Sequence, residues 1–147
     1  MSAEKKKAVI RRLAEAVNRG NLDAVDEIFA PDYVRHDPSG LLGDVGREEY
    51  KRVFANLRRA FPDARWVMED LLADGDKVIG RWTFTGTHKG QFLNVPPSGK
   101  KVTYPIIAIY RIADGKIAED WHIFHSLGLW QKLIPEIEEL LKKARGE

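Results

Sequence analysis

The sequence contains no cysteine, which excludes disulfide bridges, thiolate metal sites and catalytic thiols and favours a reducing compartment. It has no run of about 18 apolar residues and no apolar stretch behind its charged start, so we expect a cytoplasmic protein without a membrane partner. Neither sign of charge dominates, because 24 Lys and Arg face 22 Asp and Glu. The net charge of +2 is too small to indicate a nucleic-acid partner.

The composition is that of a folded globular protein, with 44% hydrophobic and 31% charged residues. At about 150 residues per domain, the 147 positions accommodate one domain, residues 1–147. No linker, internal repeat or low-complexity segment divides the chain. We therefore expect a single domain with one apolar core.

Apolar residues recur at helical spacing in the first half of the chain, which predicts three helices over residues 2–17, 22–29 and 47–61. A predicted loop that contains Tyr33 and His36 separates the second helix from the third. Near the other end, Pro135 begins a further amphipathic helix with Glu early and Lys late, as the helix dipole favours.

The second half changes to segments rich in β-branched and aromatic residues, which predict strands over residues 66–72, 77–86, 102–112 and 116–125. Asp74-Gly75-Asp76 and Asp114-Gly115-Lys116 are hairpin turns, so these strands form an antiparallel meander. A long loop, residues 86–100, joins the middle two. Helices followed by a meander indicate an α+β fold, in which a curved sheet wraps around helices and leaves an apolar pocket.

Several short segments, in this order and spacing, resemble the SnoaL-like polyketide cyclases of the nuclear-transport-factor-2-like superfamily: Asn18-Arg-Gly-Asn-Leu-Asp-Ala24, Phe29-Ala-Pro-Asp-Tyr-Val-Arg-His-Asp-Pro38, Ala60-Phe-Pro-Asp63, Ile112-Ala-Asp-Gly-Lys-Ile117 and Leu127-Gly-Leu129. The resemblance covers nearly the whole chain. It implies a cone-shaped α+β barrel with a deep pocket, frequent homodimers, and closure of an aromatic polyketide ring by an intramolecular aldol step. It also implies that no metal or organic cofactor takes part.

The resemblance implies a general base in the pocket, because the reaction removes a proton from a carbon beside a carbonyl. In the cyclases this group is an Asp that follows a Trp by four residues and precedes a Gly by three. Here Trp121 and Gly128 bracket His125 instead. A neutral imidazole, with an ordinary pKa of about 6.5, can serve as a base at neutral pH. His125 is therefore the candidate catalytic base, and a structural His at the strand-to-helix corner is the alternative.

Three further histidines have less direct interpretations. His36 precedes an Asp-Pro pair, where the family has a pocket His, so we expect it to assist His125 or else to pair with Asp37. His88 is expected to brace the long loop. Strand alternation predicts His122 on the face opposite His125, so the two cannot easily share a metal ion, and no other metal-ligand motif is present.

Two side chains are candidates for stabilising the developing oxyanion. Tyr104 lies on the expected inward face of its strand. Arg81 is expected to bind a carboxylate, a phosphate or an enolate oxygen if it points inward, with pairing to Asp70 or Glu119 as the alternative. The remaining pocket is expected to be apolar and suited to an aromatic or polycyclic ligand, with these substrate-binding residues: Tyr33, Phe54, Trp82, Ile106, Ala108 and Trp121.

The sequence thus predicts a SnoaL-like enzyme that acts on a small hydrophobic carbonyl compound by cofactor-free acid/base catalysis, as an aldol cyclase or isomerase. A non-catalytic ligand-binding or dimerising member of the family is an alternative, since the family Asp is missing. Another is an engineered hydrolase or proton-transfer enzyme, since the Glu/Lys-rich segment after Pro135 looks idealised. Apolar outward residues such as Ile107 and Ile109 predict a homodimer through the outer face of the sheet.

Overall fold

The computed structural model describes residues 1–38, 40 and 43–147. Its helical segments are α1 (Ala3–Arg19), the 3₁₀ turn η1 (Leu22–Ala24), α2 (Val25–Ile28), α3 (Arg47–Ala60), α4 (Ser126–Leu133) and α5 (Pro135–Ala144). Its strands are β1 (Phe29–His36), β2 (Val45–Gly46), β3 (Arg65–Asp74), β4 (Lys77–Thr87), β5 (Lys101–Ala113) and β6 (Lys116–Phe124). The predicted α+β class is confirmed. None of the described helices is long and apolar enough to span a membrane.

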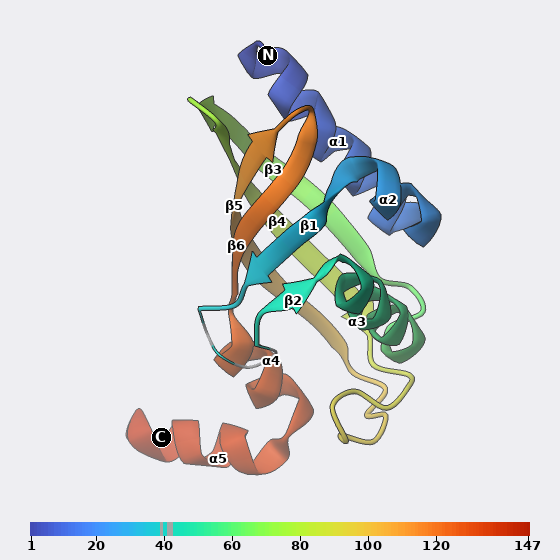
Figure 1. Cartoon of the computed structure of the whole chain (residues 1–147). Coiled ribbons are helices and arrows are strands. Elements are labelled where there is room, and N and C mark those ends of the chain that lie inside the picture. Colours follow the sequence, from blue (N-terminus) through green and yellow to red (C-terminus); the bar gives the residue numbers. More distant parts are fainter. Residues whose placement is uncertain (39, 41–42) are drawn as a thin grey trace.

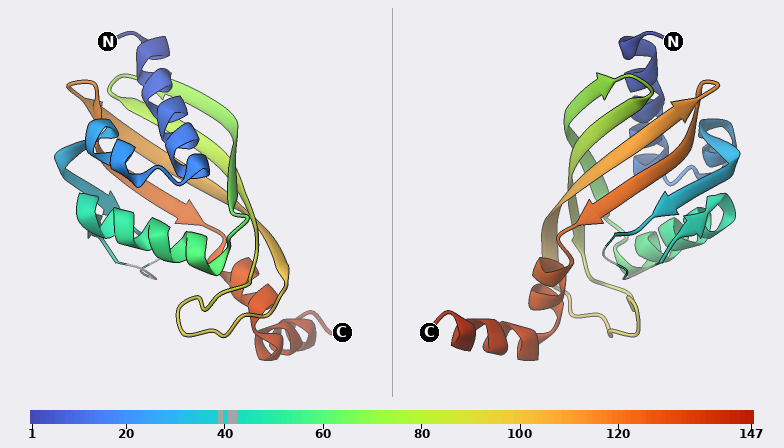
Figure 2. Two further views of the ribbon diagram at one scale, coloured as in Figure 1. Left: turned by 90° about the vertical axis from the view of Figure 1, so that its right-hand side faces the viewer. Right: turned by 60° about the vertical axis from the view of Figure 1, so that its left-hand side comes forward.

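The strands form one curved sheet in the order β2-β1-β6-β5-β4-β3, which stays open between its two edges. The predicted meander β3 to β6 is antiparallel throughout, whereas β1 runs parallel to β6. The sheet is therefore mixed. Helices α1, α2 and α3 cover one face of it, and α4 and α5 extend beyond one end (Figures 1 and 2).

The segment that contains Tyr33 and His36 is strand β1, so the prediction of a loop there is wrong. Pro31 and the Asp-Pro pair after His36 resemble turn signals in the sequence. In the fold, however, Phe29 and Tyr33 are fully buried, and β1 pairs with β6 along the sheet. Burial of these rings and the parallel pairing override the local turn propensity.

Helix α1 follows directly from its sequence. The side chain of Ser2 caps its first turn by accepting a hydrogen bond from the backbone N–H of Lys5. One apolar face is buried against β3 and β4, and at the helix end Asn18 forms paired 2.8 Å hydrogen bonds with the backbone of Trp66. These bonds fix the position of α1 over the start of β3.

Strand alternation decides which side chains face the helices. On β5 the alternate residues from Val102 to Tyr110 are buried, as predicted. On β6 the predicted inward and outward faces are exchanged, because the strand contains a β-bulge. Arg111 pairs with Glu119, whereas the next residue, Ile112, pairs with Ile117. One extra residue moves every later side chain to the opposite face.

Candidate functional site

A cavity of about 390 Å³, here called the main cavity, opens between α3, the β4–β5 loop and the inner face of β5 and β6. Its walls are largely apolar and aromatic, and several polar side chains interrupt them. The lining residues are Arg35, Val53, Phe54, Asn56, Leu57, Arg59, Trp66, Gln91, Phe92, Leu93, Asn94, Tyr104, Ile106, His122 and Phe124. This size and lining suit a small polycyclic ligand.

A second cavity of about 20 Å³, here called the inner cavity, lies beneath α1 and is bordered by Leu13, Val17 and Trp82. It shares five lining residues with the main cavity: Arg35, Phe54, Trp66, Ile106 and His122. The two cavities are therefore neighbouring parts of one site, with the aromatic mouth at the loop and the inner cavity at the far end.

Arg35 is the cation of this site. It lies on β1 with only 12% of its side chain exposed, and its Nε donates to Asp120 Oδ1 over 3.1 Å. The Tyr33 hydroxyl donates a second hydrogen bond, of 2.6 Å, to the fully buried Asp120, and the Arg35 guanidinium stacks over the Tyr50 ring at 4.8 Å. Burial lowers the pKa of Arg35, but Asp120 together with Tyr33 and Tyr50 raises it well above the ordinary value, so the guanidinium stays charged.

His122 is the titratable group that faces the main cavity from β6. Burial, and secondly the charge of Arg35, lower its pKa well below the ordinary value, so the imidazole is neutral at pH 7. Its Nδ1 is buried without a hydrogen-bond partner in the described part of the chain. A neutral imidazole in an apolar cavity is chemically a proton acceptor.

Tyr104 also lines the main cavity, as predicted, and its ring stacks on Phe84 at 4.7 Å. Burial raises the pKa of its phenol above the ordinary value. The hydroxyl therefore stays protonated and can donate a hydrogen bond to a ligand.

His125 is exposed and precedes the first residue of α4, with its imidazole over Gly128. The described cavity lining does not contain it, although the adjacent Phe124 belongs to that lining. The bulge in β6 explains this placement, because it rotates His125 to the outer face together with Trp121. The catalytic role of His125 stays a prediction.

His36 also lies on the outer face. Its Nε2 is 2.9 Å from Glu119, its Nδ1 is 3.2 Å from Asp44, and its ring stacks on Trp121 at 5.3 Å. The prediction that Trp121 faces inward and His122 outward is wrong, again because of the bulge. His36 and Trp121 therefore form a surface cluster on the side of the sheet away from the cavities.

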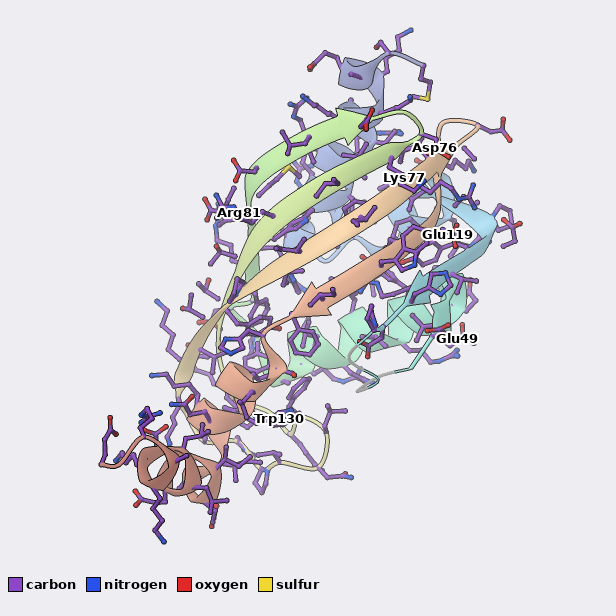
Figure 3. The ribbon with its side chains drawn as sticks, turned by 90° about the vertical axis from the view of Figure 1, so that its left-hand side faces the viewer. Glu49, Asp76, Lys77, Arg81, Glu119 and Trp130 are labelled. Atoms are coloured by element: carbon purple, nitrogen blue, oxygen red, sulfur yellow. The ribbon has the colours of Figure 1, made fainter. Side chains whose placement is uncertain are left out.

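Arg81 points outward from β4 and forms a 2.6 Å ion pair with Asp70. Figure 3 looks onto this outer face, where Arg81 lies to the left and Glu119 to the right in this view. The prediction that Arg81 faces inward is wrong, whereas the alternative of pairing with Asp70 is confirmed. The sequence contains evidence for this orientation. Trp82 and Phe84 alternate with Arg81 along the strand, and because these aromatic side chains occupy the buried face, Arg81 must lie on the exposed one.

The expected substrate-binding residues divide into three groups, of which Trp121 on the outer face is one. Phe54, Ile106 and Trp82 line the cavities. Tyr33 and Ala108 are fully buried but belong to the packing around the cavities, Tyr33 through its bond to Asp120.

Arg35 and His122 were not predicted as site residues. Arg35 lies in a segment that resembles a loop, and the placement of His122 depends on the β-bulge.

The β4–β5 loop supplies four lining residues, Gln91 to Asn94, and its base is held firmly. His88 is fully buried, and its Nδ1 accepts a 3.1 Å hydrogen bond from the Ser98 backbone N–H, which confirms its predicted bracing role. Phe92 stacks on Trp130 of α4 at 5.8 Å, so the loop and α4 meet at the same end of the sheet (Figures 1 and 3).

Comparison with known proteins agrees with this architecture. A sequence model of the SnoaL-like polyketide cyclase family matches residues 7–133. Aklanonic acid methyl ester cyclase DnrD from Streptomyces peucetius is 28% identical over 131 residues, which cover 85% of this chain and 88% of DnrD. Nogalonic acid methyl ester cyclase from Streptomyces nogalater is 27% identical over 117 residues, 76% of this chain and 86% of that protein. The structure of AclR from Streptomyces galilaeus, a proposed hydroxylase, superposes with a TM-score of 0.81 at 28% identity, covering 90% of this chain and 86% of AclR.

Proposed function

Because this chain belongs to the SnoaL-like polyketide cyclase family, we propose that it closes a ring of an aromatic polyketide by an intramolecular aldol step in the main cavity. The observation that carries the proposal is the neutral, desolvated imidazole of His122, which faces an apolar cavity of about 390 Å³ beside the charged Arg35. A base and a cation at one cavity wall are the two groups that enolate formation requires.

The reaction follows from these groups without a metal ion or an organic cofactor. His122 removes a proton from the carbon beside a substrate carbonyl, and the enolate oxygen gains charge next to Arg35. The enolate carbon then attacks a second carbonyl of the same molecule and forms the new carbon–carbon bond. The attacked oxygen takes back the proton from the imidazolium, so the product is an isomer of the substrate. Tyr104 is a second donor to the substrate from the same wall.

His125 remains the competing candidate for the base. It occupies the position of the family Asp in the sequence, whereas His122 occupies the cavity. The two histidines therefore define two versions of one mechanism, which differ in the residue that takes the proton.

The test is turnover of aklanonic acid methyl ester and nogalonic acid methyl ester, the compounds named for two relatives. His122→Gln is expected to reduce turnover about 10²- to 10⁴-fold, the usual contribution of a positioned acid/base group. His125→Gln is the matched control and should retain turnover. The reverse pattern assigns the base to His125, and binding of both esters without turnover by the wild type favours the non-catalytic alternative.

We also propose that the protein is a homodimer formed through the outer face of the sheet. Ile107 and Ile123 are cross-strand partners there, and they are 50% and 54% exposed. Ile79 extends the same face on β4. Adjacent exposed apolar side chains on a curved sheet are typical of a buried two-fold interface.

A further inference from the structure

The inner cavity has room for about one water-sized atom, because its volume is about 20 Å³ and one water requires roughly 10–15 Å³ by this measure. Eight of its ten lining residues are buried in the core, among them Leu13, Val17 and Ile106. It adjoins the main cavity through the shared walls at Arg35 and His122. A ligand in the main cavity can therefore extend a single atom into it.

The walls of the inner cavity carry hydrogen-bonding groups that the protein does not satisfy. The indole Nε1 of Trp82 and the Nδ1 of His122 are two of the three buried side-chain atoms without a partner in the described residues. Both residues line the inner cavity. Unpartnered buried polar atoms are rare in folded proteins, and two of them at one small cavity point to an absent hydrogen-bonding atom.

The position of the Trp82 indole is built into the sheet. Gly80 on β4 pairs with Ala108 on β5, so the inner face has its smallest side chains at this point. The indole folds back over Gly80 so closely that a Cβ there would lie 2.7 Å from Nε1. Burial raises the pKa of the Tyr110 phenol on β5 well above its ordinary value, and the neighbouring Trp82 indole opposes this only weakly. Trp82 Nε1 has no hydrogen-bond partner among the described residues. The indole N–H is therefore held at the cavity without an acceptor.

We propose that the inner cavity is a subsite for one carbonyl oxygen of the substrate, to which Trp82 donates a hydrogen bond through its indole N–H. The inference rests on the proposed function and deepens it by naming the substrate group that occupies the inner cavity. The Arg35 charge is already compensated by Asp120, so the subsite suits a neutral ketone or ester oxygen better than a carboxylate. An enolate oxygen that forms there gains its charge next to the guanidinium.

This subsite fixes the orientation of the substrate. The carbonyl end lies under α1, and the ring system extends past Phe54 toward Phe92 and Leu93 at the loop. The substrate class is thus a polycyclic aromatic compound with an acceptor oxygen at one end. A hydrocarbon of the same shape leaves the Trp82 N–H unpaired and binds more weakly.

The test compares two probes of equal shape, 2-acetylnaphthalene and 2-isopropenylnaphthalene, which differ by a carbonyl oxygen in place of a methylene group. The wild type is expected to bind the ketone about 5- to 20-fold more tightly, the range of one hydrogen bond to a site that is otherwise unpaired. Trp82→Phe removes the N–H but keeps an aromatic ring, and should reduce this ratio to within about twofold of unity.

Trp66→Phe is the matched control, because Trp66 lines both cavities and loses the same ring segment. It is expected to weaken both probes equally and keep their ratio. The proposal is overturned if Trp82→Phe keeps the wild-type ratio, or if both Trp variants change it to the same extent.

A second measurement reports on the N–H itself. The chain has four Trp residues, so four indole N–H signals are expected in a ¹H–¹⁵N spectrum, and Trp82→Phe assigns one of them. The ketone should shift the Trp82 proton downfield, whereas the hydrocarbon should not. Equal shifts with both probes, or none with the ketone bound, mean that a water alone occupies the inner cavity.

These experiments separate the subsite from the proposed reaction. 2-Acetylnaphthalene has a single carbonyl group and cannot undergo an intramolecular aldol step, so its binding does not depend on a catalytic base. Loss of turnover in His122→Gln with an unchanged ketone preference would support the cyclase and the subsite independently. Turnover by the wild type without any ketone preference would retain the cyclase and reject the subsite.

Discussion

Asp120 and Arg35 form a buried ion pair, with 3.1 Å between Oδ1 and Nε, that links the parallel strands β1 and β6. Arg35 pairs with Asp120 in the strand register as well, so backbone and side chains connect the same two residues. The pair places a charged guanidinium at both cavities, and the Asp120 carboxylate neutralises it. Structure and proposed chemistry therefore depend on the same contact.

Asp120→Asn is expected to reduce the free energy of unfolding by about 3–5 kcal/mol, because it leaves a largely buried Arg35 without its counter-ion. Thermal and denaturant unfolding measure the loss. Glu119→Gln, one residue away, weakens the partly exposed contacts with Arg111 and His36 and should cost about 0–1 kcal/mol. Equal losses in the two variants would contradict the special role of the Asp120 pair.

The sequence predicted the fold class and most elements, because α1, α3 and the four meander strands carry clear periodicities. The site was less accessible to the same reasoning. One extra residue between Ile117 and Glu119 decides whether His122 or His125 faces the cavity, and local sequence does not reveal a bulge. Likewise, the burial of Arg35 depends on a parallel pairing between β1 and β6, which are far apart in the sequence.

The stability of the protein is expected to fall as the pH drops below about 6.5 in a way that depends on His122. Its pKa is lowered well below the ordinary value in the folded state, so the unfolded chain binds this proton first. Each pH unit between the unfolded and folded pKa values then costs at most about 1.4 kcal/mol. Unfolding of the wild type and His122→Gln at pH 7.5 and 5.5 measures this difference.

The comparison with His122→Gln is needed because other groups titrate nearby. The pKa of His36 is raised by its hydrogen bond to Glu119 and by Asp44, so its stabilising effect is present at acid pH and lost as the pH rises through that raised pKa. This effect is the same in both proteins and cancels. A pH dependence that is identical in the wild type and the variant would show that His122 is not buried neutral.

Gly80→Ala is expected to displace the Trp82 indole, since the added Cβ would lie 2.7 Å from Nε1. The overpacking should cost about 1–3 kcal/mol of stability. Adding Trp82→Phe removes the clashing atom, so the double variant should lose less than the sum of the single losses. Strict additivity in denaturant unfolding would contradict the close contact.

Ile107→Glu together with Ile123→Glu is expected to convert the proposed homodimer into a monomer, because both charges would be buried at the outer face of the sheet. Sedimentation at tens of micromolar measures the change. Leu140→Glu on α5 is the control, since this residue is 65% exposed and lies away from the sheet. A monomeric wild type, or a dimer that both charges leave intact, would rule out this interface.

The pH profile of kcat/KM distinguishes the base from a binding group, since only the base must be unprotonated for the chemical step. The lowered pKa keeps His122 neutral at pH 6, so kcat/KM is expected to be the same at pH 6 and pH 8 and to decrease only at more acid pH. An acid limb centred near 6.5, the ordinary imidazole pKa, would contradict His122 as the base. Tyr104→Phe is the control: it removes a donor from the same wall and should lower kcat/KM at every pH without moving the acid limb. If the acid limb of the kcat/KM profile moves in Tyr104→Phe but stays in place in His122→Gln, the titrating group lies near the Tyr104 phenol and is not His122.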